Sequence, residues 1–159
     1  IRGGGQERGL RAGTENVAAI AGFAAAASAA QHSNTQRLGA LRDRFEAGLK
    51  SSTPQVVIFG EDVPRLSNTS LFTVPGLKAE TAIIAFDLNG VAVSSGSACS
   101  SGKVQASHVL AAMGVEPAVA RGAVRVSLGW TTTEAEIDAL LTAWNKVVSS
   151  LFNKQANAA

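Results

Sequence analysis

The helix expected at the end of this sequence constrains the fold most, because its apolar side chains keep to one face for four turns. It begins at Thr133, where the sequence Thr-Glu-Ala-Glu is a capping box. Apolar residues then recur at steps of three and four, which is the spacing of a single helical face. Such a stripe requires an apolar partner surface. Its members are Ile137, Leu140, Leu141, Trp144, Val147, Val148, Leu151 and Phe152.

A strand with alternating residues precedes this helix, over residues 123–129. Apolar and polar side chains alternate with period two, so Arg125 and Ser127 face away from the apolar positions. An arginine in the middle of such a strand lies either on a wetted face or against a ligand carboxylate, which guanidinium binds in a planar, bidentate geometry. The pattern leaves both interpretations open. The apolar positions are Val124, Val126 and Leu128.

The remaining patterns predict more helices than strands. We expect a two-layer α+β fold, in which helices cover a small, mostly antiparallel sheet. Residues 1–33 are expected to form a glycine-rich loop and a linking helix, which is an N-terminal helical arm. Residues 34–159 are expected to form a C-terminal domain. The predicted helices cover residues 15–30, 36–50, 79–88 and 107–113, and the predicted strands cover residues 56–59, 68–74 and 91–93.

Composition and charge exclude several classes of partner. The 159 residues are 46% hydrophobic, which is enough for one core, and the net charge of +2 is too small to favour nucleic acid or an anionic membrane. The apolar run over residues 17–30 is too short to span a bilayer. A single cysteine permits no internal disulfide, so we expect a cytoplasmic protein. Since the sequence opens inside a loop and without methionine, we also expect it to be a piece of a longer protein.

That single cysteine, Cys99, lies among small residues that extend from Ser94 to Gly102. Such a segment has little apolar area to bury, so we expect an exposed, mobile loop whose thiol moves between two places. Lys103 is close enough in sequence to favour the thiolate, which is the nucleophilic form. The alternative is that Cys99 acts only as a small buried hydrophobe. His108 follows this segment and could act as a base for Cys99, but we interpret it as a surface histidine or one whose hydrogen bonds are satisfied elsewhere.

A glycine-rich loop lies near the start of the sequence, over residues 3–14. Glycines let the backbone approach a ligand closely, and Thr14 follows them where a helix N-cap is expected. A hydroxyl, two arginines and a helix N-terminus together suit an anion such as phosphate. The alternative is an ordinary solvated connection whose arginines face water.

Three separate stretches of the sequence resemble cysteine desulfurases of the NifS-like type. They are GGGQERGLRAGTEN at residues 3–16, SSGSACSS at residues 94–101, and RVSLGWTTTEAEID at residues 125–138. The resemblance implies the class V aminotransferase group of pyridoxal-phosphate enzymes, with fold type I and a homodimeric assembly. It implies that the chain is the C-terminal part of such an enzyme and contains its small domain. Members of the family take sulfur from L-cysteine and leave L-alanine.

The resemblance also implies roles for three residues. Cys99 corresponds to the cysteine that attacks the substrate sulfur and holds it as a persulfide. Arg125 corresponds to the arginine that binds the substrate α-carboxylate, and Thr14 to the threonine that contacts the cofactor phosphate across the dimer interface. The implied partners are a sulfur acceptor or an iron–sulfur scaffold protein. In some relatives the residue at Cys99 would also help to hold a transient iron–sulfur cluster.

The sequence departs from the family in one important respect. The family binds its cofactor through a Schiff-base lysine in a Ser-x-His-Lys segment, and no lysine of this sequence lies in such a segment. We therefore expect the chain alone to be inactive. Two alternatives stay open, namely another enzyme of the same family, such as a selenocysteine lyase or an aminotransferase, and a non-catalytic sulfur-carrier or interaction module. The lysines are Lys50, Lys78, Lys103, Lys146 and Lys154.

Overall fold

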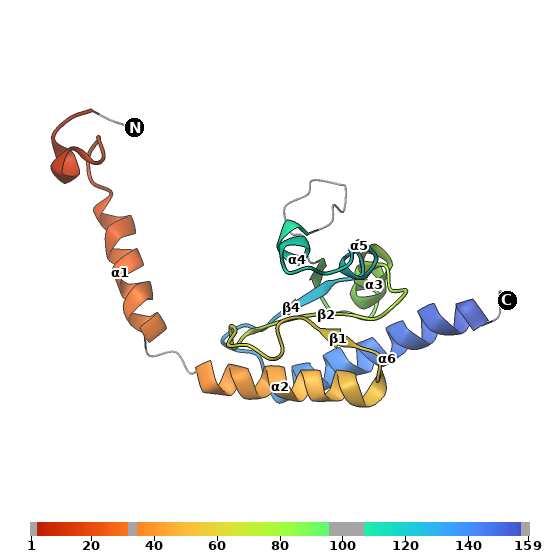
Figure 1. The fold of residues 1–159 in the computed structure, drawn as a ribbon. Coiled ribbons are helices and arrows are strands. Elements are labelled where there is room, and N and C mark those ends of the chain that lie inside the picture. The colour runs from red at the N-terminus through yellow and green to blue at the C-terminus, as the bar shows by residue number, and fades with distance from the viewer. Residues whose placement is uncertain (1–2, 32–34, 96–106, 157–159) are drawn as a thin grey trace. The chain divides into compact units, whose positions relative to one another are not determined.

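The computed structural model describes residues 3–31, 35–95 and 107–156 of the chain (Figure 1). The chain divides into two compact units, residues 1–34 and residues 35–159. No helix within the described residues is long and apolar enough to cross a membrane.

The first unit contains a 3-10 turn, η1 (Gln6–Gly9), and one helix, α1 (Val17–Gln31). The predicted N-cap at Thr14 is wrong by two residues. The Asn16 side-chain oxygen accepts a hydrogen bond from the Ala19 backbone N–H at 3.0 Å, so Asn16 caps the helix. α1 contains no charged residue, and none of its residues is buried.

The second unit is built on a four-stranded sheet with the strand order β1-β2-β4-β3, and every neighbouring pair is antiparallel. In this register, Leu71 of β2 and Ser94 of β3 lie on either side of Arg125 of β4. The α+β class and the small antiparallel sheet are therefore confirmed. The strands are β1 (Val57–Ile58), β2 (Thr69–Thr73), β3 (Ser94–Ser95) and β4 (Val124–Ser127).

The strand predicted over residues 91–93 is wrong, because the strand in this region, β3, begins at Ser94. The Val91 backbone N–H donates to the Phe86 carbonyl oxygen at 3.0 Å, so Val91 continues the turn that ends helix α3 (Ala79–Asp87). Val91 and Val93 still pack against the core from this irregular segment.

Helices α2 (Thr35–Ser52), α3 and α6 (Glu134–Ala156) pack with one face of the sheet to form the main core. The Phe72 ring contacts the fully buried Trp144 ring edge-on, with centroids 5.2 Å apart. The Trp144 indole N–H donates to the buried Thr53 hydroxyl at 3.1 Å. The predicted stripe on the last helix is confirmed at Ile137, Leu140, Trp144 and Val147, all buried, whereas the Leu151 and Phe152 side chains lie outside the described part.

The other face of the sheet is only partly covered, by the short helices α4 (His108–Ala112) and α5 (Pro117–Ala120). Leu110 of α4 and Ala120 of α5 form a second buried cluster with Ala123, and Leu71 packs against it. The sequence patterns did not predict α5, which has four residues with Pro117 at its first turn. Since Leu71 is the partner of Arg125 in the sheet, Arg125 emerges on this second face.

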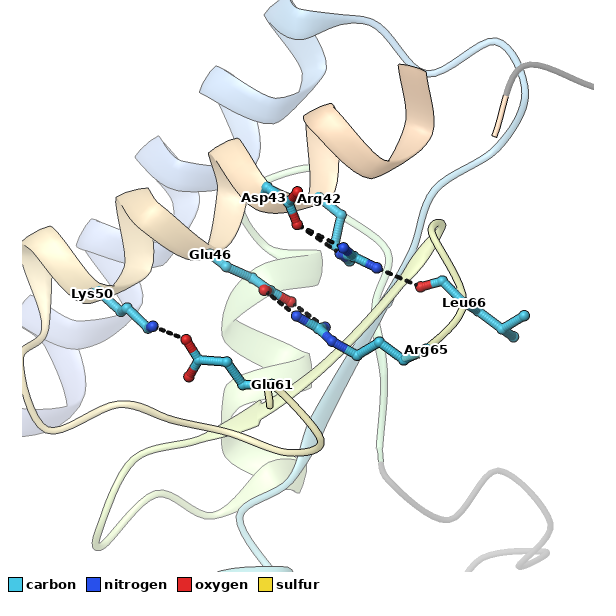
Figure 2. Close-up of polar contacts among 7 residues, drawn as sticks. All are labelled: Arg42, Asp43, Glu46, Lys50, Glu61, Arg65 and Leu66. Carbon is cyan, nitrogen blue, oxygen red and sulfur yellow. Dashed lines mark hydrogen bonds and ion pairs between the residues drawn. The ribbon is translucent and has the colours of Figure 1, made fainter. Parts of the chain in front are cut away.

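A segment between β1 and β2, residues 61–66, lies beside α2 (Figure 2). Three residues of α2, spaced one turn apart, contact it. Arg42 donates to the Leu66 carbonyl oxygen at 2.8 Å, Glu46 binds Arg65, and Lys50 pairs with Glu61. These contacts fix the chain just before it enters β2.

Candidate functional site

Arg125 is the predicted site residue whose surroundings the structure describes most fully. Its neighbours in the strand, Val124 and Val126, are buried in the main core, and Arg125 projects from the opposite face of the sheet. The predicted alternation is therefore confirmed. The Arg125 residue as a whole is half-buried, whereas its Nε atom is fully buried and has no hydrogen-bond partner among the described residues.

The unpaired Nε distinguishes Arg125 from the arginines of the surface networks. Arg65 binds the Glu46 carboxylate, and Arg44 binds both Glu134 and Asp138. Within the described part of the chain, no carboxylate pairs with Arg125. A buried charged donor without an acceptor is unfavourable, and a planar carboxylate is the ligand that matches a guanidinium group. The donor set of Arg125 therefore fits the carboxylate of a small molecule.

Thr14 belongs to the first unit, where it is exposed and lines a hollow of about 360 Å³. Arg11 lies at the same hollow, but its guanidinium stabilises the loop itself. Arg11 Nη1 donates to the Gly13 carbonyl oxygen at 2.9 Å, and Nη2 lies 3.4 Å from Glu7 Oε1. The accessible hydroxyl beside the start of α1 suits a phosphate oxygen, whereas Arg11 is already engaged. The other residues that line the hollow are Asn16, Ala19, Ile20 and Phe23.

The loop before Thr14 has an unusual backbone. Glu7 and Arg8 have φ values of 52° and 57°, a left-handed conformation that residues other than glycine adopt at an energetic cost. Gln6, next to them, has a buried side-chain oxygen without a hydrogen-bond partner among the described residues. Strained backbone and unpaired polar atoms are concentrated at binding sites, so these features agree with a loop that holds a ligand.

Cys99 and Lys103 lie outside the described residues, so the exposure, mobility and thiolate character predicted for Cys99 stay predictions. The two ends of their segment are described. At one end, β3 pairs with β4 beside Arg125. At the other end, the buried Ser107 hydroxyl caps α4 by accepting from the Leu110 backbone N–H at 3.4 Å. The segment that carries the cysteine therefore starts next to Arg125.

His108, the histidine that follows this segment, is the first residue of α4 and is exposed. The described residues also contain no group of three or more His, Cys, Asp or Glu side chains that could hold a metal ion.

Comparison with known proteins identifies the family of this chain. Residues 4–140 match the Aminotransferase class-V family. The chain belongs to that family. It is 45% identical over 145 residues to an IscS-like cysteine desulfurase of Mycobacterium tuberculosis, and 42% identical over 157 residues to the cysteine desulfurase NifS of Azotobacter vinelandii. These alignments cover 89% and 96% of this chain but only 37% and 39% of the two relatives.

Solved structures of NifS-like proteins also resemble this chain. A NifS-like protein from Rickettsia africae superimposes with a TM-score of 0.81 at 39% identity, over 94% of this chain and 39% of that protein. A second NifS-like protein gives a TM-score of 0.80 at 34% identity. The predicted resemblance to NifS-like cysteine desulfurases is confirmed, and the chain spans about two fifths of the length of its relatives.

Proposed function

We propose that this chain is the C-terminal part of a pyridoxal-phosphate-dependent cysteine desulfurase, which transfers sulfur from L-cysteine to Cys99 and leaves L-alanine. The relatives that carry this name support the proposal. The single observation that carries it is the buried Nε of Arg125, which has no hydrogen-bond partner among the described residues and lies on the strand that pairs with the start of the cysteine segment. A binding group for an amino-acid carboxylate and a movable nucleophile are the two functions that this reaction requires of the domain.

In this proposal Arg125 binds the α-carboxylate of L-cysteine through two parallel N–H···O bonds, which fix the orientation of the substrate. The Cys99 thiolate then forms a bond with the substrate sulfur while the carbon–sulfur bond breaks. The bonding electron pair stays on carbon and takes up a proton, which gives the methyl group of L-alanine. Cys99 is left as a persulfide.

Pyridoxal phosphate, when bound, supplies the electron sink that makes this carbon–sulfur cleavage feasible. From this chain, the Thr14 hydroxyl would contact the cofactor phosphate, and in a homodimer it would do so across the subunit interface. We propose that residues 1–33 serve this cofactor and dimer role, while residues 34–159 form the small domain. The cofactor-binding lysine would lie outside this chain, which alone should then be inactive.

The cellular role is proposed from the NifS and IscS names of the relatives. The Cys99 persulfide would pass its sulfur to an acceptor or to an iron–sulfur scaffold protein in the cytoplasm, for cluster assembly or for the synthesis of another thio-cofactor. Cys99 would also serve as a transient ligand of an iron–sulfur cluster.

The test compares the whole protein with the chain of residues 1–159, each incubated with pyridoxal phosphate and L-cysteine. The whole protein should release L-alanine and gain a persulfide on Cys99, detected by mass spectrometry, and residues 1–159 should do neither. Cys99→Ser should abolish sulfur transfer, because an alcohol cannot replace a soft thiolate. Undiminished alanine formation by that variant would refute the nucleophilic role. A persulfide acquired only from another sulfurtransferase would instead indicate a carrier module.

A further inference from the structure

Ser94 lies directly opposite Arg125 in the antiparallel pair of β3 and β4. Residues opposite each other in such a pair share one face of the sheet, with Cβ atoms about 4.5–5.5 Å apart. The Ser94 hydroxyl therefore emerges beside the base of the Arg125 side chain, on the face turned away from the main core. Ser95 pairs with Val124 and projects toward the opposite face.

The surroundings of Arg125 Nε make Ser94 the natural acceptor. Leu71, on the other side of Arg125 in the sheet, has an apolar side chain that accepts no hydrogen bond. Arg125 Nε is buried without a partner among the described residues, whereas Ser94 is half-buried. A serine hydroxyl has two lone pairs and a rotatable proton, so it accepts from an adjacent N–H after a change of rotamer.

We propose that Ser94 is a positioning residue for Arg125. When the guanidinium binds the substrate carboxylate, the Ser94 hydroxyl accepts the Nε–H and leaves both Nη groups for the two carboxylate oxygens. This proposal rests on the proposed function, because it assigns Arg125 to the carboxylate of L-cysteine. It also connects the carboxylate site directly to the strand from which the cysteine segment begins.

The experiment uses the whole protein and the variant Ser94→Ala. Loss of one hydrogen bond that orients the guanidinium should raise the KM for L-cysteine about fivefold and leave kcat nearly unchanged. The dissociation constant of L-alanine, which retains the carboxylate, should rise by the same factor. Inhibition by cysteamine, which lacks the carboxylate, should not change. Ser94→Thr retains a hydroxyl and should behave like the natural protein.

Ser95→Ala is the matched control, since it makes the same chemical change on the adjacent residue and on the opposite face. It should leave the KM for L-cysteine unchanged, and any structural cost should appear only in its melting temperature. If Ser95→Ala raised KM as much as Ser94→Ala, or if cysteamine inhibition weakened equally, the effect would be structural and the proposal would be overturned.

A double-mutant cycle separates this proposal from the proposed function. In an Arg125→Ala background, adding Ser94→Ala should change L-alanine binding less than twofold, because the group that Ser94 positions is absent. An equal effect of Ser94→Ala in both backgrounds would overturn the positioning role. If Arg125→Ala weakens binding and Ser94→Ala does not, only the positioning role is wrong. If Arg125→Ala leaves binding unchanged, the carboxylate role proposed for Arg125 is wrong.

Discussion

Replacing Arg65 by methionine should strongly destabilise the second unit, because it leaves a buried carboxylate without its partner (Figure 2). Arg65 donates from both Nη atoms to the two carboxylate oxygens of Glu46, at 2.6 Å each. The Glu46 side chain is only 8% exposed and that of Arg65 is 18% exposed. Breaking a buried ion pair costs about 3–5 kcal/mol, and the partial exposure of Arg65 places this pair near 3 kcal/mol.

The destabilisation should depend on pH in a defined direction. Burial opposes the ionisation of Glu46, but the hydrogen bonds from Arg65 and the charges of Arg65 and Arg42 outweigh it, so the pKa of Glu46 lies below 4.5 in the folded chain. A lowered pKa stabilises the fold above the pKa of the unfolded chain, and this stabilisation is lost as pH falls through the folded value. Without Arg65, burial raises the pKa of Glu46 in the variant, so the difference in unfolding free energy between the natural chain and Arg65→Met should be smaller at pH 4 than at pH 7.

Urea unfolding at pH 7 and at pH 4 measures both effects. Lys50→Met is the matched control, since Lys50 and Glu61 are 49% and 39% exposed and such a pair contributes less than about 1 kcal/mol. The double variant Glu46→Gln with Arg65→Met removes the uncompensated charge and should be more stable than Arg65→Met alone. If Arg65→Met cost no more than Lys50→Met, or if its cost were the same at both pH values, the inferred buried ion pair would be wrong.

Three further predictions concern the packing, the last helix and the site. Gly122→Ala should lower the free energy of unfolding in urea by about 1–3 kcal/mol, because a Cβ would lie 2.6 Å from the Leu77 carbonyl oxygen. Gly39→Ala in α2 should not lower it, and equal effects of the two variants would contradict this reasoning. Thr133→Ala should lower the free energy of unfolding by about 1 kcal/mol, since the Thr133 hydroxyl accepts from the Glu136 backbone N–H. An unchanged melting temperature would argue against that cap. Arg125→Ala should weaken L-alanine binding in the whole protein without loss of stability, and a loss as large as that of Val124→Ala would indicate a structural role.

The sequence predicted correctly those elements whose apolar side chains recur with one period and pack against one core. The steps of three and four after Thr133 match the buried side of α6, and the period of two around Arg125 matches the two faces of β4. Both patterns persist over enough residues that any other placement would expose several large apolar side chains. The sequence therefore predicted β4 and α6, one strand of the sheet and one helix that covers it.

The errors lie where one local interaction competes with another. Val91 and Val93 have the composition of a strand, but a backbone hydrogen bond to Phe86 holds Val91 in the turn after α3. At the start of α1, Thr14 and Asn16 are both good caps, and only the contact with Ala19 distinguishes them. The four residues of α5 are too few for any periodicity to be detected.

In the candidate site, too, the sequence predicts what depends on a single strand and not what depends on the pairing of two strands. The outward direction of Arg125 follows from its own strand, because the alternation with Val124 and Val126 is a local property. That Ser94 is its neighbour depends on the register between β3 and β4, which are separated in sequence by α4 and α5. If the strand had ended at residue 93, as predicted, Ser94 would have lain outside the sheet. The cysteine segment would then not have followed directly on a strand that pairs with β4. Pairing at Ser94 and Ser95 instead makes Arg125 and the start of that segment parts of one antiparallel ladder, so the register between two strands, and not the local sequence, places Ser94 beside Arg125.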